Sequence, residues 1–335
     1  MKKNHILSLL FVLLFSFTYA QTITFISEKT NQPLPKVSVF GKDGNILAFS
    51  DIDGKIDKQF IKPDQEKFQL VYDNFSIATL SYSDFDKDVI KINDRIKDIE
   101  AVVIKNNNPA KYILIKGNFN AYVTQNNRLK SYADGIVTYI FSNTTKKLKS
   151  INVEQYRIFT LQNDGWQQAH SGYTGGLEIP RLKYLGNPDE YKTGKNNIKE
   201  LKGDKSDQIE IIDRTGSEKG TSFLGITMYD YKKIINISFE KGSKKTLKDF
   251  LEYSEVRSMK IKYKEKPDHE QLVLYNNFYA TEFSFSNDDD VKKVKFNRSS
   301  SNYQTSYWQD PSFPNMQPVF SSFFKKDLKE EPNEN

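Results

Sequence analysis

Between Thr22 and Lys105, short apolar stretches alternate with turn-forming residues, and this pattern limits the fold more than any other feature of the chain. Within most stretches apolar and polar residues alternate, as a strand with one buried face requires. Short strands separated by Pro, Asn, Asp and Gly predict a small β-sandwich here. The stretches are TITFIS, KVSVF, ILAFS, KIDKQFI, KFQLVY, IATLSY, VIKIN and IEAVVIK.

Two turns in this region contain aspartate, which raises the question of a calcium site. Lys42–Asn45 predicts a hairpin turn, and Asp51, Asp53 and Gly54 have the composition of a second one. A calcium loop beginning at Asp51 would need a glutamate at its twelfth position, where this chain has Lys62. The sequence therefore predicts a turn without metal, in which Gly54 adopts a positive φ.

The same region resembles the carboxypeptidase regulatory-like domain, and the resemblance covers about residues 21–105. It implies a seven-stranded, transthyretin-like β-sandwich that serves as an accessory module without catalytic residues. Such modules precede outer-membrane receptors and other envelope proteins in Gram-negative bacteria. The matching residues are Pro33, Leu34, Val37, Val39, Asp51, Asp53, Gly54, Phe60, Leu70 and Ala101–Ile104.

Residues 1–20 have the three parts of a secretory signal peptide: basic Lys2 and Lys3, an apolar run, and small residues near its end. We expect cleavage between Ala20 and Gln21 and export to the periplasm or the outer membrane. The apolar run is too short for an ordinary membrane span, and no transmembrane span is predicted in the mature chain. The chain has no cysteine, so neither lipidation after the signal nor a disulfide framework is predicted.

A linker at 106–110 is followed by longer alternating stretches over 111–326, which predict a larger, curved antiparallel sheet. One short helix is expected at 245–253, with Leu247, Phe250 and Leu251 on one face, and a second at 318–328. In YNNFYATEFSFS, strict alternation puts Phe283 and Phe285 on the apolar side with Tyr279, opposite Phe278. The polar end of the chain, 327–335, is expected to be disordered. The predicted fold class is thus mainly β, a sandwich plus a large sheet.

Charge and residue inventory exclude several classes of function. The net charge is +6 with both signs interspersed, so a nucleic-acid binder is not predicted. Beyond the signal the only histidines are His170 and His269, and no H-E-x-x-H motif is present. GTSFLG at 220–225 differs by one residue from the nucleophile motif G-x-S-x-G. We therefore predict no catalytic, metal or cofactor residue, and we expect a non-enzymatic protein.

What remains is a binding or structural module of the cell envelope that contacts a protein, a glycan or an apolar ligand. Candidate ligand-binding residues are aromatic side chains in polar loops: Trp166, Tyr173, Tyr307 and Trp308. Alternatively each tryptophan covers the end of the sheet core, since tryptophan is highly buried on average. The curved sheet could itself enclose an apolar ligand. A hydrolase of envelope glycans stays open as well, because paired carboxylates are not visible in a sequence.

Overall fold

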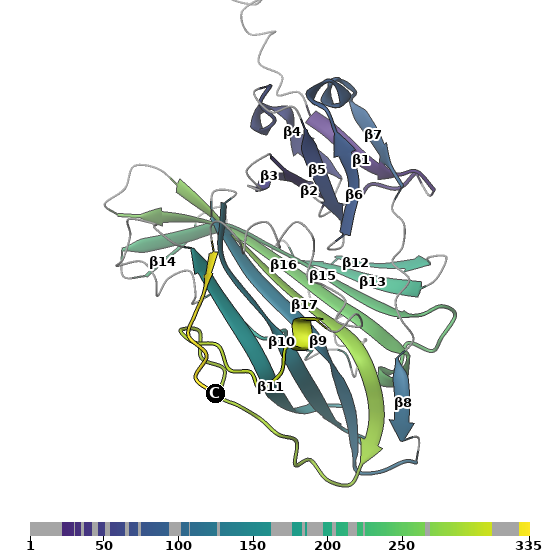
Figure 1. Ribbon diagram of the computed structural model, residues 1–335. Coiled ribbons are helices and arrows are strands. Elements are labelled where there is room, and N and C mark those ends of the chain that lie inside the picture. The colour runs from purple at the N-terminus through teal and green to yellow at the C-terminus, as the bar shows by residue number, and fades with distance from the viewer. Residues whose placement is uncertain are drawn as a thin grey trace, which may run out of the picture. The chain divides into compact units, whose positions relative to one another are not determined.

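The chain forms two compact units, Met1–Arg95 and Ile96–Asn335, and each has its own hydrophobic core. The computed structural model confirms a mainly β fold (Figure 1). It describes residues 22–29, 31–34, 37–41, 46–50, 54–63, 67–72, 75–93, 102–106, 108–125, 128–161, 176–182, 185, 197–202, 206–213, 220–223, 225–264, 269–309 and 328–335. The predicted signal peptide, with Ala20 and Gln21, lies outside these residues, as do the turns 42–45 and 51–53 and most of the predicted helix 318–328.

The described strands of the first unit form a three-stranded sheet, β4-β1-β7, and a four-stranded sheet, β3-β2-β5-β6. Side chains from both sheets, among them Phe25 and Leu70, build one buried core, as in the predicted sandwich. The strands are β1 (Thr22–Ser27), β2 (Ser38–Phe40), β3 (Ile46–Phe49), β4 (Lys55–Asp57), β5 (Phe68–Tyr72), β6 (Phe75–Leu80) and β7 (Val89–Ile92), and the 3-10 helices are η1 (Lys58–Phe60) and η2 (Tyr82–Asp86).

Gly54 precedes β4 with a φ of 72°, as expected for this turn. A Cβ atom at this position would lie 2.4 Å from the carbonyl oxygen of Phe25. Both the backbone conformation and the space therefore require glycine here.

The second unit is built on one large sheet, with the order β12-β13-β15-β16-β17-β9-β10-β11-β18 among the described residues. Two short strands lie off this path, β14 beside β15 and β8 beside β17. The main strands are β9 (Tyr112–Gln125), β10 (Arg128–Ser142), β11 (Leu148–Leu161), β12 (Asn197–Lys202), β13 (Ser206–Asp213), β15 (Ile226–Glu240), β16 (Phe250–Tyr263) and β17 (His269–Ser286). The short elements are β8 (Val103–Asn106), β14 (Thr221–Phe223), β18 (Leu328–Glu330), η4 (Leu247–Asp249) and η5 (Tyr307–Gln309).

One face of this sheet, here called the apolar face, supplies the core of the second unit. β17 does not alternate strictly, in contrast to the prediction from the sequence, because it contains a bulge: its pairing with β9 shifts register between Ala280 and Glu282. Because the extra residue reverses the phase, Phe278 and Phe283 both belong to the apolar core, and Phe285 packs against it. The predicted orientation of Phe283 and Phe285 is correct, whereas placing Phe278 on the opposite side was wrong.

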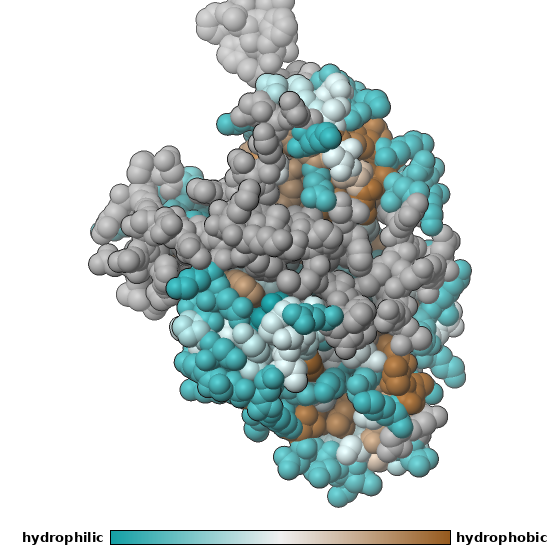
Figure 2. All heavy atoms as spheres, viewed as in Figure 1, coloured by the Kyte–Doolittle hydropathy of each residue, from teal (hydrophilic) through white to brown (hydrophobic). Residues whose placement is uncertain are grey.

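The last stretch assigned to the sandwich, IEAVVIK, belongs to the second unit instead. Its last three residues, together with Asn106, form β8 (Val103–Asn106), which pairs in parallel with β17 from Glu282 to Ser284. β16 begins at Phe250, and its pairing with β17 ends at Tyr279, so β17 has an edge beyond that point for β8 to occupy. Val103 and Ile104 are exposed apolar residues on β8. Figure 2 likewise shows small hydrophobic areas on the mostly hydrophilic visible face of this unit.

Two further expectations were wrong for local reasons. The predicted helix at 245–253 contains one 3-10 turn, η4, and β16 begins at Phe250 because Phe250 pairs with Phe239 of β15. The end of the chain is ordered: β18 pairs antiparallel with β11, and Asn333 bridges to Ser301. A polar composition did not prevent this, since the backbone donors and acceptors of an edge strand such as β11 can pair with any sequence.

Candidate functional site

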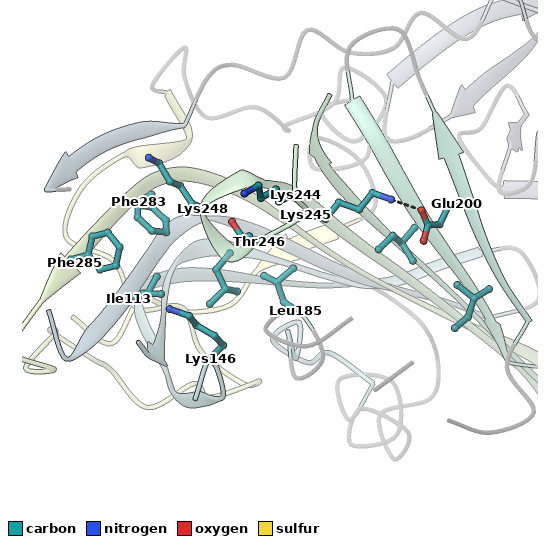
Figure 3. Close-up of a pocket in the computed structure, with 13 residues that line it drawn as sticks. Ile113, Lys146, Leu185, Glu200, Lys244, Lys245, Thr246, Lys248, Phe283 and Phe285 are labelled. Carbon is teal, nitrogen blue, oxygen red and sulfur yellow. Dashed lines mark hydrogen bonds and ion pairs between the residues drawn. The ribbon is translucent and has the colours of Figure 1, made fainter. Parts of the chain in front are cut away.

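An apolar pocket of about 600 Å³ lies in the second unit, at one end of the large sheet (Figure 3). Its volume falls within the usual range for small-molecule sites, about 300–1,000 Å³. The lining comes from strands far apart in the sheet order and from the connection between β15 and β16. The lining residues are Ile113, Lys146, Leu185, Ile198, Glu200, Ile209, Lys244–Lys248, Phe283 and Phe285.

Ile, Leu and Phe side chains form the apolar part of the pocket wall. Ile113 and Phe283 rise from adjacent strands of the sheet, and Leu247 enters from the β15–β16 connection. These three side chains are at most 5% exposed, so they belong to the core as well as to the wall. In Figure 3, Phe283, Phe285 and Ile113 gather at one end of the pocket, and Glu200 lies at the other. An apolar ligand could therefore contact several buried side chains at once.

Four lysines surround this hydrocarbon: Lys146, Lys244, Lys245 and Lys248, here called the lysine rim. Lys245 donates to the Glu200 carboxylate at 2.6 Å, which is the dashed contact in Figure 3. Lys146 donates to the amide oxygen of Asn143 at 2.5 Å and makes no ion pair with another described residue. Lys244 and Lys248 are exposed, and within the described residues neither makes an ion pair.

Local backbone chemistry positions the rim. Gly242 has a φ of 67° and donates its N–H to the Asp207 carboxylate at 3.0 Å, which fixes the turn after β15. The Asp249 carboxylate then accepts from the backbone N–H of Thr246 at 2.9 Å and from its hydroxyl at 2.8 Å. This capping box closes the single turn of η4. In that turn Leu247 is buried and Lys248 is exposed, so an apolar wall and a cation come from adjacent residues.

The two described aromatic candidates from the sequence lie elsewhere, on the opposite face of the sheet. Tyr307 is buried, and its hydroxyl donates to the Asp134 carboxylate at 2.6 Å. Burial, together with the negative charge of Asp134, raises the pKa of Tyr307 well above its ordinary value. Arg157 binds the same carboxylate through Nε at 3.0 Å and Nη2 at 2.6 Å.

Trp308 covers the guanidinium of Arg157, whose central carbon lies 4.0 Å from the centre of a Trp308 ring. Tyr303 and Tyr307 meet Trp308 edge to face. Arg157 therefore occupies one ring face of Trp308. We call Asp134, Arg157, Tyr307 and Trp308 the arginine cluster. Trp166 and Tyr173 lie outside the described residues.

A pair of carboxylates is also present, at Glu178 and Glu255. Arg257 donates to Glu178 at 2.7 Å and forms an ion pair with Glu255 at 2.8 Å, and Glu255 accepts from the Tyr253 hydroxyl at 2.6 Å. Both carboxylates are therefore partners of the same guanidinium group. In the described part of the chain, no group of three or more His, Cys, Asp or Glu residues could hold a metal ion. No described helix is long and apolar enough to cross a membrane.

Comparison with known proteins adds little. No family model and no curated protein matches this sequence. A solved structure entitled "Lipid-protein interactions in lipovitellin" aligns with 56% of this chain at 8% identity and a TM-score of 0.25. The alignment spans only 27% of that protein, and at this TM-score it supports no conclusion about fold or function.

Sequence reasoning did not find the lysine rim. The segment KGSKKTLKDF was available, with three rim lysines around Leu247 between two strands. The spacing of its apolar residues fits one face of a helix equally well, so the sequence alone did not predict a turn here. Lys146 lies about a hundred residues away in sequence, and only the pairing of the strands brings it to the same pocket.

Proposed function

We propose that the second unit is a non-enzymatic binding module that takes the apolar chain of a small amphiphilic ligand into the pocket. The observation behind this proposal is a pocket of about 600 Å³ with walls of Ile, Leu and Phe. Burying apolar surface is the main favourable term in such binding, at roughly 0.8 kcal/mol for each buried methylene.

We also propose that this binding takes place in the cell envelope. The signal-like residues 1–20 and the envelope-type sandwich favour export to the periplasm or the outer membrane, with the first unit as an accessory module. Sequencing the N-terminus of the protein recovered from the envelope tests this. We expect Gln21 as the first residue, and a chain that still begins with Met1 would contradict export with cleavage.

Calorimetric titration of the mature chain with octanol, decanol and dodecanol tests the binding itself. Each added methylene should lower the dissociation constant about fourfold while the chain still fits the pocket. Phe285→Ala should weaken dodecanol binding because it removes part of the wall. Phe60→Ala, the same change at an exposed residue of the first unit, is the matched control and should have no effect.

Two results would overturn the proposed function. One is the lack of saturable binding for all three alcohols. The other is binding that Phe285→Ala and Phe60→Ala change equally, since the alcohols would then bind outside the pocket.

A further inference from the structure

The charges at the pocket are strongly unbalanced. Among the described residues that line it, four are cationic and only Glu200 is acidic. Glu200 is engaged by Lys245, so Lys146, Lys244 and Lys248 have no ion-pair partner in the described part of the chain. The nearby Asp249 carboxylate is turned toward the backbone N–H and hydroxyl of Thr246 instead.

Two of these lysines also sit in an unusual backbone conformation. Lys146 has a φ of 57° and Lys245 a φ of 55°, in the left-handed region that glycine and asparagine normally occupy. Strained backbone conformations are held by the surrounding structure, and they cluster at functional sites. Here the side chain present is a lysine in both cases, and both turns border the same pocket.

We propose that the ligand of this pocket carries an acidic head, a carboxylate or a phosphate monoester, at the end of a single apolar chain. The lysine rim binds the head through charge-assisted hydrogen bonds from the ammonium groups. The Ile, Leu and Phe side chains of the pocket contact the apolar chain of the ligand. This inference rests on the proposed function, because it specifies the chemical class of ligand for the same pocket.

The rim favours this ligand over other amphiphiles. A neutral head would gain no charge-assisted hydrogen bond, and a cationic head would be repelled by the ammonium groups of the rim. A carboxylate and a phosphate monoester share the chemistry that the rim recognises, and only their relative affinity distinguishes them.

The deciding experiment compares ligands of equal chain length on the full mature protein. Dodecanoate, dodecyl phosphate, dodecanol and dodecylammonium are titrated at pH 8, below their aggregation concentrations, at low salt and at high salt. We expect one or both acidic ligands to bind about tenfold more tightly than dodecanol at low salt, and this advantage to shrink as salt screens the exposed lysines. Dodecylammonium should bind more weakly than dodecanol.

Substitutions of the rim lysines test whether these residues cause the preference for acidic ligands. The triple variant Lys146→Gln, Lys244→Gln, Lys248→Gln should lose most of the acid-over-alcohol advantage and keep its affinity for dodecanol. Lys293→Gln, the same type of substitution at one exposed lysine that does not line the pocket, should leave every affinity unchanged. Glu200→Gln frees Lys245 and should raise acid affinity about two- to threefold, which loss of structure could not produce.

The outcomes separate this inference from the proposed function. Equal binding of dodecanoate, dodecyl phosphate and dodecanol would refute the acidic head and leave the pocket as a site for neutral chains. An acid preference that survives the triple variant would also refute the role of the rim. Failure of all four ligands to bind would refute the proposed function itself.

Discussion

The arginine cluster and the lysine rim of the second unit differ in how their positive charges are surrounded. Arg157 has a bidentate carboxylate partner in Asp134, and a Trp308 ring covers it. Three of the four rim lysines border the pocket, and within the described residues none of these three has a carboxylate bound to it. A guanidinium fits the planar carboxylate in two hydrogen bonds, whereas an ammonium acts as a compact charge that an arriving anion can share. The arginine cluster thus has its charges paired internally, whereas the lysine rim fits the binding role that we propose for the pocket.

The largest expected effect comes from removing the internal cation. Arg157→Met leaves the Asp134 carboxylate, which is 0% exposed, without its ionic partner. We expect a loss of about 3–5 kcal/mol in the free energy of unfolding, measured by urea denaturation, with ligand affinity unchanged in the folded protein.

Lys248→Met makes the equivalent change at the rim and serves as the comparison. Because Lys248 is exposed, its effect on unfolding should stay within about 0.5 kcal/mol. Equal losses of stability in the two variants would contradict the contrast between the regions.

A smaller effect is expected from the two phenylalanines of β17. Phe283 is 2% exposed within the core, so Phe283→Ala should cost about 3 kcal/mol in unfolding free energy. Phe285 is only partly buried, and Phe285→Ala should cost about 1–2 kcal/mol. Urea unfolding of both variants checks the order, and a larger loss for Phe285→Ala would contradict the wall that the structure places there.

The sequence was sufficient for the parts of the fold that rest on local alternation. Alternating stretches predicted both β-units, and the composition of its turn predicted the positive φ of Gly54. The sequence was not sufficient where pairing between distant strands determines which way a side chain points or where a strand begins. The bulge beside Ala280 reverses the phase of β17 for a reason that lies in the register with β9. The segment 245–253 has helical spacing, yet backbone pairing with β15 extends the strand to Phe250.

The candidate site was hidden for the same reason. Tyr307 and Trp308 stood out because they are aromatic residues in polar loops, but their partners Asp134 and Arg157 lie far away in sequence. Lysines are common, and nothing in their spacing links Lys146 with Lys244 and Lys248. Only the folded sheet brings these charges to one pocket.

The smallest expected effect concerns backbone strain at the rim. Lys146→Gly relieves the left-handed conformation and should raise the free energy of unfolding by up to about 1 kcal/mol. The same variant should weaken dodecanoate binding because it removes a rim charge. Thermal unfolding and titration of one preparation check both changes, and a loss of stability would contradict the strain.

We propose that the ligand enters at the lysine rim and leaves the arginine cluster unchanged. Amide hydrogen exchange of the mature protein, with and without saturating dodecanoate, tests this proposal. We expect slower exchange in the β15–β16 connection, from Lys241 to Asp249, and at the end of β17 around Phe283 and Phe285. Exchange around Arg157 and Trp308 should not change. Slower exchange confined to the arginine cluster, or no change at the pocket despite bound ligand, would contradict it.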